Sequence, residues 1–245
     1  MTRLYAPLPY AIDAEFDLPE DAHHHWIRVL RARPGDTAEL FDGAGNAARV
    51  ELIDIHKRGA RVRVLTLSAS ANESPLHTHL GQVMSKGERL DYALQKAVEL
   101  GVSEITLLTS ERCELKLRGE ERADKKLAHW QRVMIGACEQ SGRNTLPLLH
   151  GPISVADWQA QMQAEQKWVM APAVTGGPQA STKSPASVAL LIGPEGGLSD
   201  GEIQAAQQAG FQPWQLGPRV LRTETAPVAA LSVLQLLYGD YASAR

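Results

Sequence analysis

Cysteine is scarce in this sequence, whose 245 residues contain only Cys113 and Cys138 and no CxxC pair. Two cysteines at this spacing argue against a disulfide framework and suit a reducing compartment. No apolar run approaches the roughly 20 residues that span a bilayer. The opening stretch MTRLYAPLPYAIDAEF also lacks the apolar core of a secretory signal. We therefore expect a cytoplasmic protein without a membrane segment.

Metal-ligand patterns and excess positive charge are missing as well. The histidines at 23–25 are consecutive, so they do not converge on one ion in a helix or strand, and we expect no metal. The formal net charge of −3 excludes a generally basic surface. Basic residues nevertheless cluster at Arg28, Arg31 and Arg33, and again within 57–63. Charge alone leaves two interpretations open, an RNA-binding face or solvated strand faces.

Hydrophobic patterning divides the chain into two parts. Up to about residue 70, short alternating apolar runs are separated by the turn segments DGAGN and HKRGA, which predicts a small β-barrel. The polar stretch SASANESP follows, so we expect domains at 1–72 and 73–245. Beyond it, strands alternate with helices, which predicts an α/β domain with a largely parallel sheet covered on both faces.

The stretch LLIGPEGGLSDGEI, residues 190–203, places three glycines, a proline and a carboxylate between a predicted strand and a helix. Ser199 and Glu202 have the spacing of a capping box. The glycines fit neither a Walker loop nor a dinucleotide fingerprint, and Glu195 would repel a pyrophosphate. Glycines let the backbone approach a ligand closely. S-adenosylmethionine, with a sulfonium and an adenosine but no phosphate, fits better; a plain tight turn is the alternative.

Two further strand ends have a similar character, VMAP near Met170 and LGPRVLRTETA from Leu216. In open α/β sheets, ligands bind beyond the carboxyl ends of the strands. Arg222 lies next to Glu224 at a predicted helix start, where a cation opposes the helix dipole. That position suggests a role in orienting an anion, such as an RNA phosphate or a deprotonated base. The alternative is a surface ion pair of little energetic value.

The motifs IGPEGGLSDGEI and LGPRVLRTETA closely resemble the RsmE family of 16S ribosomal RNA uridine-N3 methyltransferases, within the SPOUT (trefoil-knot) class. KGERLDYALQKAVELGVSEI, SERCELKL, ACEQSGRNTLP and HHWIRVLRARPGD extend the resemblance over nearly the whole chain. It implies an N-terminal PUA-like RNA-binding β-barrel and a C-terminal knotted parallel-sheet domain. It also implies S-adenosylmethionine as cofactor, 16S ribosomal RNA or the small subunit as partner, and a homodimer. Nothing in the periodicity indicates a knot.

The resemblance also implies site residues, by motif match. The cofactor loops would comprise Met170, Ala171 and Pro172; Ile192, Gly193, Glu195, Gly196 and Gly197; and Leu216, Gly217, Leu221, Arg222, Thr225 and Ala226. The catalytic candidates are Arg222, to stabilise a developing anion, and Glu224, to accept a proton, with water as the alternative acceptor. The candidate RNA contacts are Arg3, Arg28, Arg31, Lys86 and Arg143.

The implied reaction is an in-line displacement at the methyl carbon by uridine N3. The sulfonium already activates the methyl group, so the protein mainly positions the partners and shapes the charge around them. The base must be unpaired or flipped, and N3 must lose its proton. Two rivals share the fold: a non-catalytic RNA-binding factor without cofactor affinity, and an enzyme that methylates a ribose 2′-hydroxyl.

Overall fold

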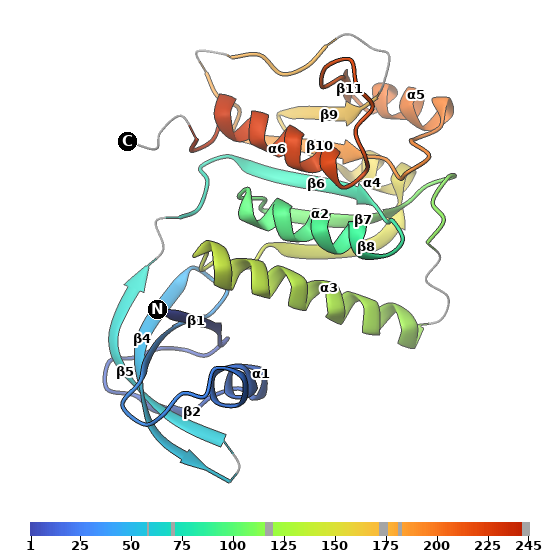
Figure 1. Ribbon diagram of the computed structural model, residues 1–245. Coiled ribbons are helices and arrows are strands. Elements are labelled where there is room, and N and C mark those ends of the chain that lie inside the picture. The colour runs from blue at the N-terminus through green and yellow to red at the C-terminus, as the bar shows by residue number, and fades with distance from the viewer. Residues whose placement is uncertain (58, 70–71, 116–119, 172–175, 181–182, 242–245) are drawn as a thin grey trace. The chain divides into compact units, whose positions relative to one another are not determined.

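The computed structural model describes residues 1–57, 59–69, 72–115, 120–171, 176–180 and 183–241. They divide into two compact units, Met1–Glu73 with Ile135–Leu146, and Ser74–Met134 with Pro147–Arg245. Each unit contains one β-sheet (Figure 1). The domain limits 1–72 and 73–245 stay a prediction; no sequence pattern indicated that residues 135–146 pack with the first unit.

The first unit is built on a five-stranded sheet with the order β1-β3-β4-β5-β2. Only the β1–β3 pair is parallel among these strands. Register shifts interrupt the β4–β5 ladder at two places, and such bulges bend a strand. The elements are β1 (Thr2–Tyr5), β2 (Glu15–Asp17), α1 (Glu20–His23), the π-helical η1 (His24–Val29), β3 (Thr37–Phe41), β4 (Asn46–His56) and β5 (Gly59–Ala69).

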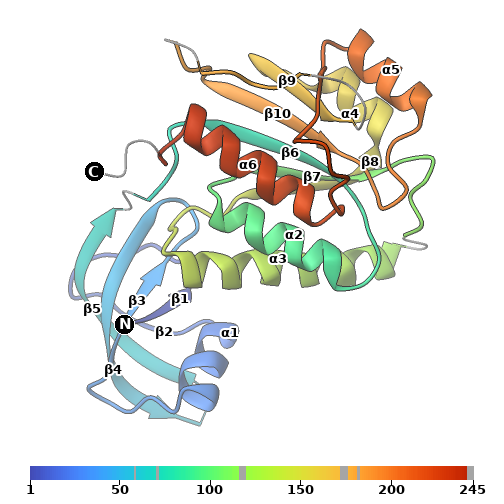
Figure 2. The same ribbon diagram turned by 45° about the horizontal axis from the view of Figure 1, so that its top comes forward.

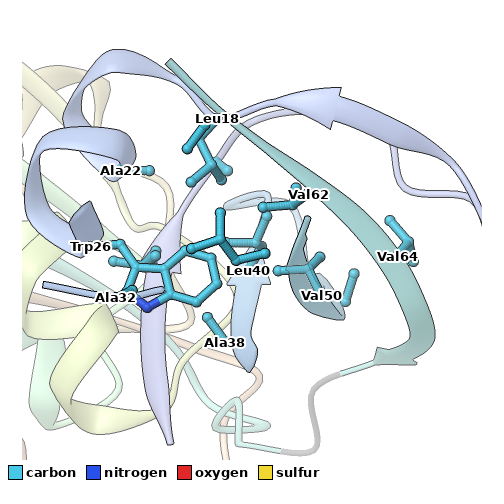
Figure 3. Packing of buried hydrophobic residues seen from close by; sticks show 14 residues of the cluster. Leu18, Ala22, Trp26, Ala32, Ala38, Leu40, Val50, Val62 and Val64 are labelled. Atoms are coloured by element: carbon cyan, nitrogen blue, oxygen red, sulfur yellow. The ribbon is translucent and has the colours of Figure 1, made fainter. Parts of the chain in front are cut away.

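The apolar core of this unit surrounds Trp26 of η1, whose side chain is buried (Figure 3). Val50 of β4 and Val62 and Val64 of β5 point into it, because alternate residues of a strand share one face. The opposite face of β5 carries Arg61 and Arg63. The expectation of a β-rich first part is confirmed, and its pattern arises from this one-sided burial.

The basic cluster on β5 is ion-paired with the neighbouring strand. Arg63 Nη2 lies 2.8 Å from Glu15 Oε1, and Arg61 Nε lies 3.3 Å from Asp17 Oδ1. Both pairs are solvent-exposed, so each contributes little to stability. For these two arginines the structure favours the interpretation as a solvated strand face.

Arg143 forms a partly buried ion pair inside the first unit. Its side chain is 5% exposed, and its Nη2 donates to Glu73 Oε2 at 2.6 Å. Arg3 lies nearby, donating from Nη2 to Asn144 Oδ1 at 2.7 Å and pairing with Glu39. Arg3 and Arg143 were both candidate RNA contacts. In the structure their guanidinium groups bond to Glu39, Glu73 and Asn144 within the first unit. These bonds favour a structural role for both arginines over an RNA contact.

Removing the partner of this buried cation tests that assignment. Glu73→Ala removes the carboxylate that pairs with the buried Arg143 guanidinium, and because the Glu73 side chain is 30% exposed we expect the free energy of unfolding to fall by about 1–3 kcal/mol. Urea denaturation followed by circular dichroism measures the change. Glu121→Ala is the matched control, because it breaks a highly exposed pair with Lys125 and should change stability little. Equal effects of the two substitutions would show that the Arg143 pair is not structural.

The second unit is an α/β layer structure around a six-stranded sheet with the order β11-β9-β10-β6-β7-β8. All of its strand pairs are parallel, which confirms the predicted parallel sheet. The elements are β6 (His77–Val83), α2 (Glu88–Glu99), β7 (Glu104–Thr109), α3 (Glu120–Ser141), β8 (Leu148–Ser154), α4 (Val155–Gln161), β9 (Gln166–Met170), β10 (Ser187–Ile192), α5 (Asp200–Gln208), β11 (Gln212–Trp214) and α6 (Thr225–Leu237). The part of α3 from Ile135 onward belongs to the first unit.

Helices cover both faces of this sheet. Figure 2 shows α2 and α6 side by side on one face and α4 and α5 on the other. Gln235 of α6 is fully buried; its side chain accepts from Ser74 Oγ at 2.7 Å and donates to the Leu100 carbonyl at 2.9 Å. These bonds fix the last helix to the start of the unit and to the end of α2. No helix in the described part of the chain combines the length and the apolarity that crossing a membrane requires.

The strand order reverses once within the sheet. The chain adds β7 and β8 on one side of β6, and then β9, β10 and β11 on the other. Strand β10 lies between β9 and β6, so it enters a position that β9 left open. The carboxyl ends of β9, β10 and β11 therefore meet at one edge, where a parallel sheet places its ligands.

Candidate functional site

A cavity of about 560 Å³ lies where these three strands end. The segments after β9, β10 and β11 all contribute to its wall, as the Gly- and Pro-bounded strand ends led us to expect. The lining residues are Arg112, Met170, Ala171, Ile192, Gly193, Pro194, Glu195, Gly196, Gly197, Leu198, Asp200, Ile203, Trp214, Gln215, Leu216, Pro218, Arg219, Val220, Leu221, Thr223 and Ala226.

The cavity gathers most of the predicted cofactor residues from the three motifs. Those that line it are Met170, Ala171, Ile192, Gly193, Glu195, Gly196, Gly197, Leu216, Leu221 and Ala226. Gly217, Arg222 and Thr225 lie beside the wall without lining it, and Pro172 lies outside the described residues. The segment after β11, residues 215–224, is the third segment. Gly217 has a φ of +69° and supplies a turn in it.

Local interactions explain the course of the glycine segment, residues 193–197. The Gly197 N–H donates to the Pro194 carbonyl at 2.9 Å, which closes a tight turn, and the φ of Gly197 is +68°. The predicted capping box is present: Ser199 Oγ accepts from the Glu202 N–H at 3.2 Å, and Glu202 Oε2 accepts from the Ser199 N–H at 2.8 Å. The helix start thus holds the end of the segment in place.

Arg112 is a part of the site that the sequence reasoning missed. Its Nη1 donates to the carbonyl of Gly196 at 3.0 Å and to that of Leu198 at 3.3 Å. A guanidinium cation makes a stronger hydrogen bond to a carbonyl than a neutral donor does. The only available signal was the motif SERCELKL, which contains this arginine.

Glu195, which argued against a phosphate ligand, is itself paired. Arg89 Nη1 of α2 lies 2.9 Å from Glu195 Oε1, with the Glu195 side chain 32% exposed. Partial exposure limits the strength of the pair, and Arg89 offsets part of the charge that Glu195 brings to the cavity. The pairing partner is 106 positions away in sequence and could not be read from it.

Trp214 adds an aromatic wall. It is the last residue of β11 and is buried, and its ring contacts that of Trp168 at 5.9 Å between centroids. Both tryptophans belong to the strand edge that supports the cavity. Sequence reasoning assigned Trp214 only to a strand, because an apolar side chain at a strand end is usually packing.

The two catalytic candidates lie at the start of α6. Arg222 Nη1 and Glu224 Oε1 are 4.0 Å apart, and the Arg222 side chain is 77% exposed. Such an exposed ion pair contributes little to the stability of the fold. Glu224 is only 17% exposed, and its Oε2 is buried with no hydrogen-bond partner among the described residues. The geometry therefore leaves the arginine exposed to solvent and one oxygen of the Glu224 carboxylate buried without a partner.

Three candidate RNA contacts are exposed on their own units. Arg28 and Arg31 lie at and just after the end of η1, with Arg31 at a φ of +59°. Lys86 follows β6 and is 59% exposed, and Glu114, whose carboxylate is 2.8 Å away, raises the pKa of Lys86. Of the predicted set, Arg28 and Arg31 are the exposed pair closest together in sequence.

The fold and the cavity define the class of protein. The sequence model described as RNA methyltransferase domain matches residues 72–235, and the one described as RNA methyltransferase PUA domain matches residues 18–65. The chain is thus an RNA methyltransferase by class, with a parallel α/β domain and a PUA domain.

Individual relatives narrow this class. The ribosomal RNA small subunit methyltransferase E of Buchnera aphidicola subsp. Schizaphis graminum is 37% identical over 239 residues, covering 97% of each chain. The protein of that name from Neisseria gonorrhoeae, solved with S-adenosyl methionine, is 40% identical with a TM-score of 0.91, covering 98% of this chain and 99% of that one. A putative methyltransferase from Legionella pneumophila, solved with the same cofactor, is 40% identical with a TM-score of 0.94 over 98% of both chains. The chain belongs to the ribosomal RNA small subunit methyltransferase E family.

Proposed function

We propose that this chain transfers a methyl group from S-adenosylmethionine to N3 of a uridine in 16S ribosomal RNA of the small subunit. The observation that carries the proposal is the convergence of the three strand-end segments on one cavity. Nearly full-length relatives at 40% identity were crystallised with this cofactor. The two free cysteines are buried, which is compatible with activity in the cytoplasm.

The cavity suits this cofactor in size and chemistry. Its volume of about 560 Å³ is typical of small-molecule sites. Ile192, Trp214 and Leu216 offer apolar surface to an adenosine, and the glycine segment offers backbone groups at close range. Glu195 favours a positively charged ligand over a phosphate. When bound, the cofactor supplies a methyl group already activated by its sulfonium.

The residues of the chain then have two tasks. The cavity wall orients the methyl donor, which is the main requirement of an in-line displacement. Arg222, an exposed residue of the third segment, would stabilise the anion that develops on the uracil ring. Glu224 or a water molecule would accept the N3 proton.

The decisive experiment is nucleoside analysis of ribosomal RNA treated with the protein and cofactor. N3-methyluridine supports the proposal, a methylated ribose identifies the 2′-hydroxyl enzyme, and no transfer together with no cofactor affinity identifies a non-catalytic RNA-binding factor.

Arg222→Ala tests the catalytic assignment. We expect turnover to fall by about a hundredfold, as for loss of one charge-stabilising donor. The dissociation constant for S-adenosylmethionine should stay within about twofold, because Arg222 does not line the cavity. Single-turnover methylation and calorimetry measure the two quantities. The exposed Arg132 of α3 is the control, and Arg132→Ala should change neither. Equal losses of rate and cofactor affinity would reassign Arg222 to cofactor binding.

Arg28 and Arg31 are proposed to contact RNA phosphates. The double variant Arg28→Ala with Arg31→Ala should weaken RNA binding and reduce its logarithmic salt slope by about two, without altering cofactor affinity. Filter binding across a salt series measures this. Arg61→Ala with Arg63→Ala removes the same charge from the ion-paired strand face and should have a smaller effect. The same slope change in both double variants would mean that net charge, and not a defined contact, drives binding.

The expected homodimer is also part of the proposal. Val228, Ala229, Val233 and Leu236 of α6 leave an apolar face partly exposed, with Leu236 57% exposed, and such a face favours a partner of the same kind. Leu236→Glu should shift the protein toward monomer in sedimentation velocity. Leu148→Glu changes a leucine of β8 that is 58% exposed, and should leave the assembly intact. A dimer unaffected by Leu236→Glu would place its interface elsewhere.

We further propose that the end of the chain is threaded as a trefoil knot, as the SPOUT resemblance implies. The insertion of β10 between β9 and β6 supports this arrangement. Tracing the backbone of a crystal structure with both ends drawn taut tests it.

A further inference from the structure

A chain of side-chain hydrogen bonds runs behind the cavity wall. Gln82 is the penultimate residue of β6, is 1% exposed, and lies in register with Ile192 at the end of β10. Its Nε2 donates to the Val83 carbonyl at 3.1 Å and to Thr223 Oγ1 at 3.2 Å. A carbonyl only accepts, so the orientation of the Gln82 amide is fixed by its own backbone.

Thr223 links Gln82 to the glycine segment through its hydroxyl. Its hydroxyl accepts from Gln82 and donates to the Gly193 carbonyl at 2.8 Å. Thr223 is 6% exposed, and both it and Gly193 line the cavity. One hydroxyl therefore joins β6, the third segment and the first residue of the glycine segment.

Gly193 has little room to move by itself. A Cβ at this position would lie 3.0 Å from the Leu198 N and 3.1 Å from its Cγ. The backbone here is packed against the far end of its own turn. A shift of the Gly193 carbonyl would therefore displace the turn that carries Glu195 and Gly196.

The Gln82 side chain is not explained by packing. Its Oε1 is buried without a hydrogen-bond partner among the described residues, and burying such an acceptor is unfavourable. A methionine or leucine would fill similar space without that cost. The hydrogen bond from Gln82 Nε2 to the Thr223 hydroxyl is the best explanation for an amide at this position.

We propose that Gln82 and Thr223 are positioning residues that hold the glycine segment and the third segment at the separation that cofactor binding requires. This inference rests on the proposed function, because it takes S-adenosylmethionine as the ligand of the cavity. Neither residue acts on the reacting atoms. Both act through the carbonyl of Gly193.

Hydroxyl rescue in the full-length protein tests the proposal. Thr223→Val keeps the shape of the side chain but removes the hydrogen bond to the Gly193 carbonyl and one of the two hydrogen bonds that the Gln82 amide donates. We expect the dissociation constant and the KM for S-adenosylmethionine to rise about tenfold, the size of one lost hydrogen bond. Thr223→Ser restores the hydroxyl and should stay within about threefold of wild type, and the KM for RNA should not change. Gln82→Met should weaken cofactor binding, and its effect should not add to that of Thr223→Val.

Controls separate this role from stability and from the proposed function. Ser232→Ala removes a hydroxyl bond to the Val228 carbonyl within α6 and should leave cofactor affinity unchanged. Thermal melts identify folded variants. Folded Thr223→Val or Gln82→Met with wild-type affinity, or equal losses in Thr223→Ser and Thr223→Val, would overturn the positioning role alone. A wild-type protein that does not bind S-adenosylmethionine in calorimetry would overturn the proposed function, and this inference with it.

Discussion

The insertion of β10 between β9 and β6 is the constraint on which the site depends. Parallel pairing on both sides of β10 fixes its register, so the carboxyl end of Ile192 reaches the edge of the sheet level with Gln82. The glycine segment must begin at that point. Because β9 and β11 pair in the same direction, their following segments leave the sheet at the same edge. The cavity is thus a product of strand order, and side chains refine it.

Charge then decides what the cavity can hold. The glycine segment carries Glu195, whose partner Arg89 comes from α2, while Arg112 donates to the carbonyls of Gly196 and of Leu198, the residue just after the segment. A phosphate would meet a carboxylate at the turn, and the nearby guanidinium is already engaged with backbone oxygens. The wall carries charge of both signs, because Arg112 and Arg219 line the cavity together with Glu195 and Asp200, so a ligand that bears both a cation and an anion meets no such conflict. The pairing with Arg89 weakens the electrostatic argument from Glu195, because the guanidinium offsets the charge of the carboxylate and solvent screens it further.

The sequence permitted prediction of features that depend on neighbours in the chain. The capping box at Ser199 and the three Gly- or Pro-bounded strand ends are local patterns. The strand ends include most of the residues that line the cavity. The roles of Arg112 and Arg143 depend on partners more than 60 positions away, and no periodicity reveals these. No local pattern predicts β8, because Gly151 and Pro152 interrupt its apolar residues, and a strand at the sheet edge tolerates them. The specific activity came from motif resemblance, since fold physics alone does not distinguish a base from a ribose as the methyl acceptor.

The arginines of this chain illustrate why a count of basic residues says little about RNA binding. Arg3 and Arg143 hold one unit together, Arg61 and Arg63 pair along a strand, and Arg112 supports a loop. A guanidinium already bonded to a carboxylate or carbonyl must lose that bond, or share it, before it can bind a phosphate. The mildly acidic total charge is therefore no obstacle to an RNA substrate. What matters is how many cations remain exposed and uncommitted, and by that criterion Arg28 and Arg31, near the end of η1, outweigh Arg61 and Arg63 of β5.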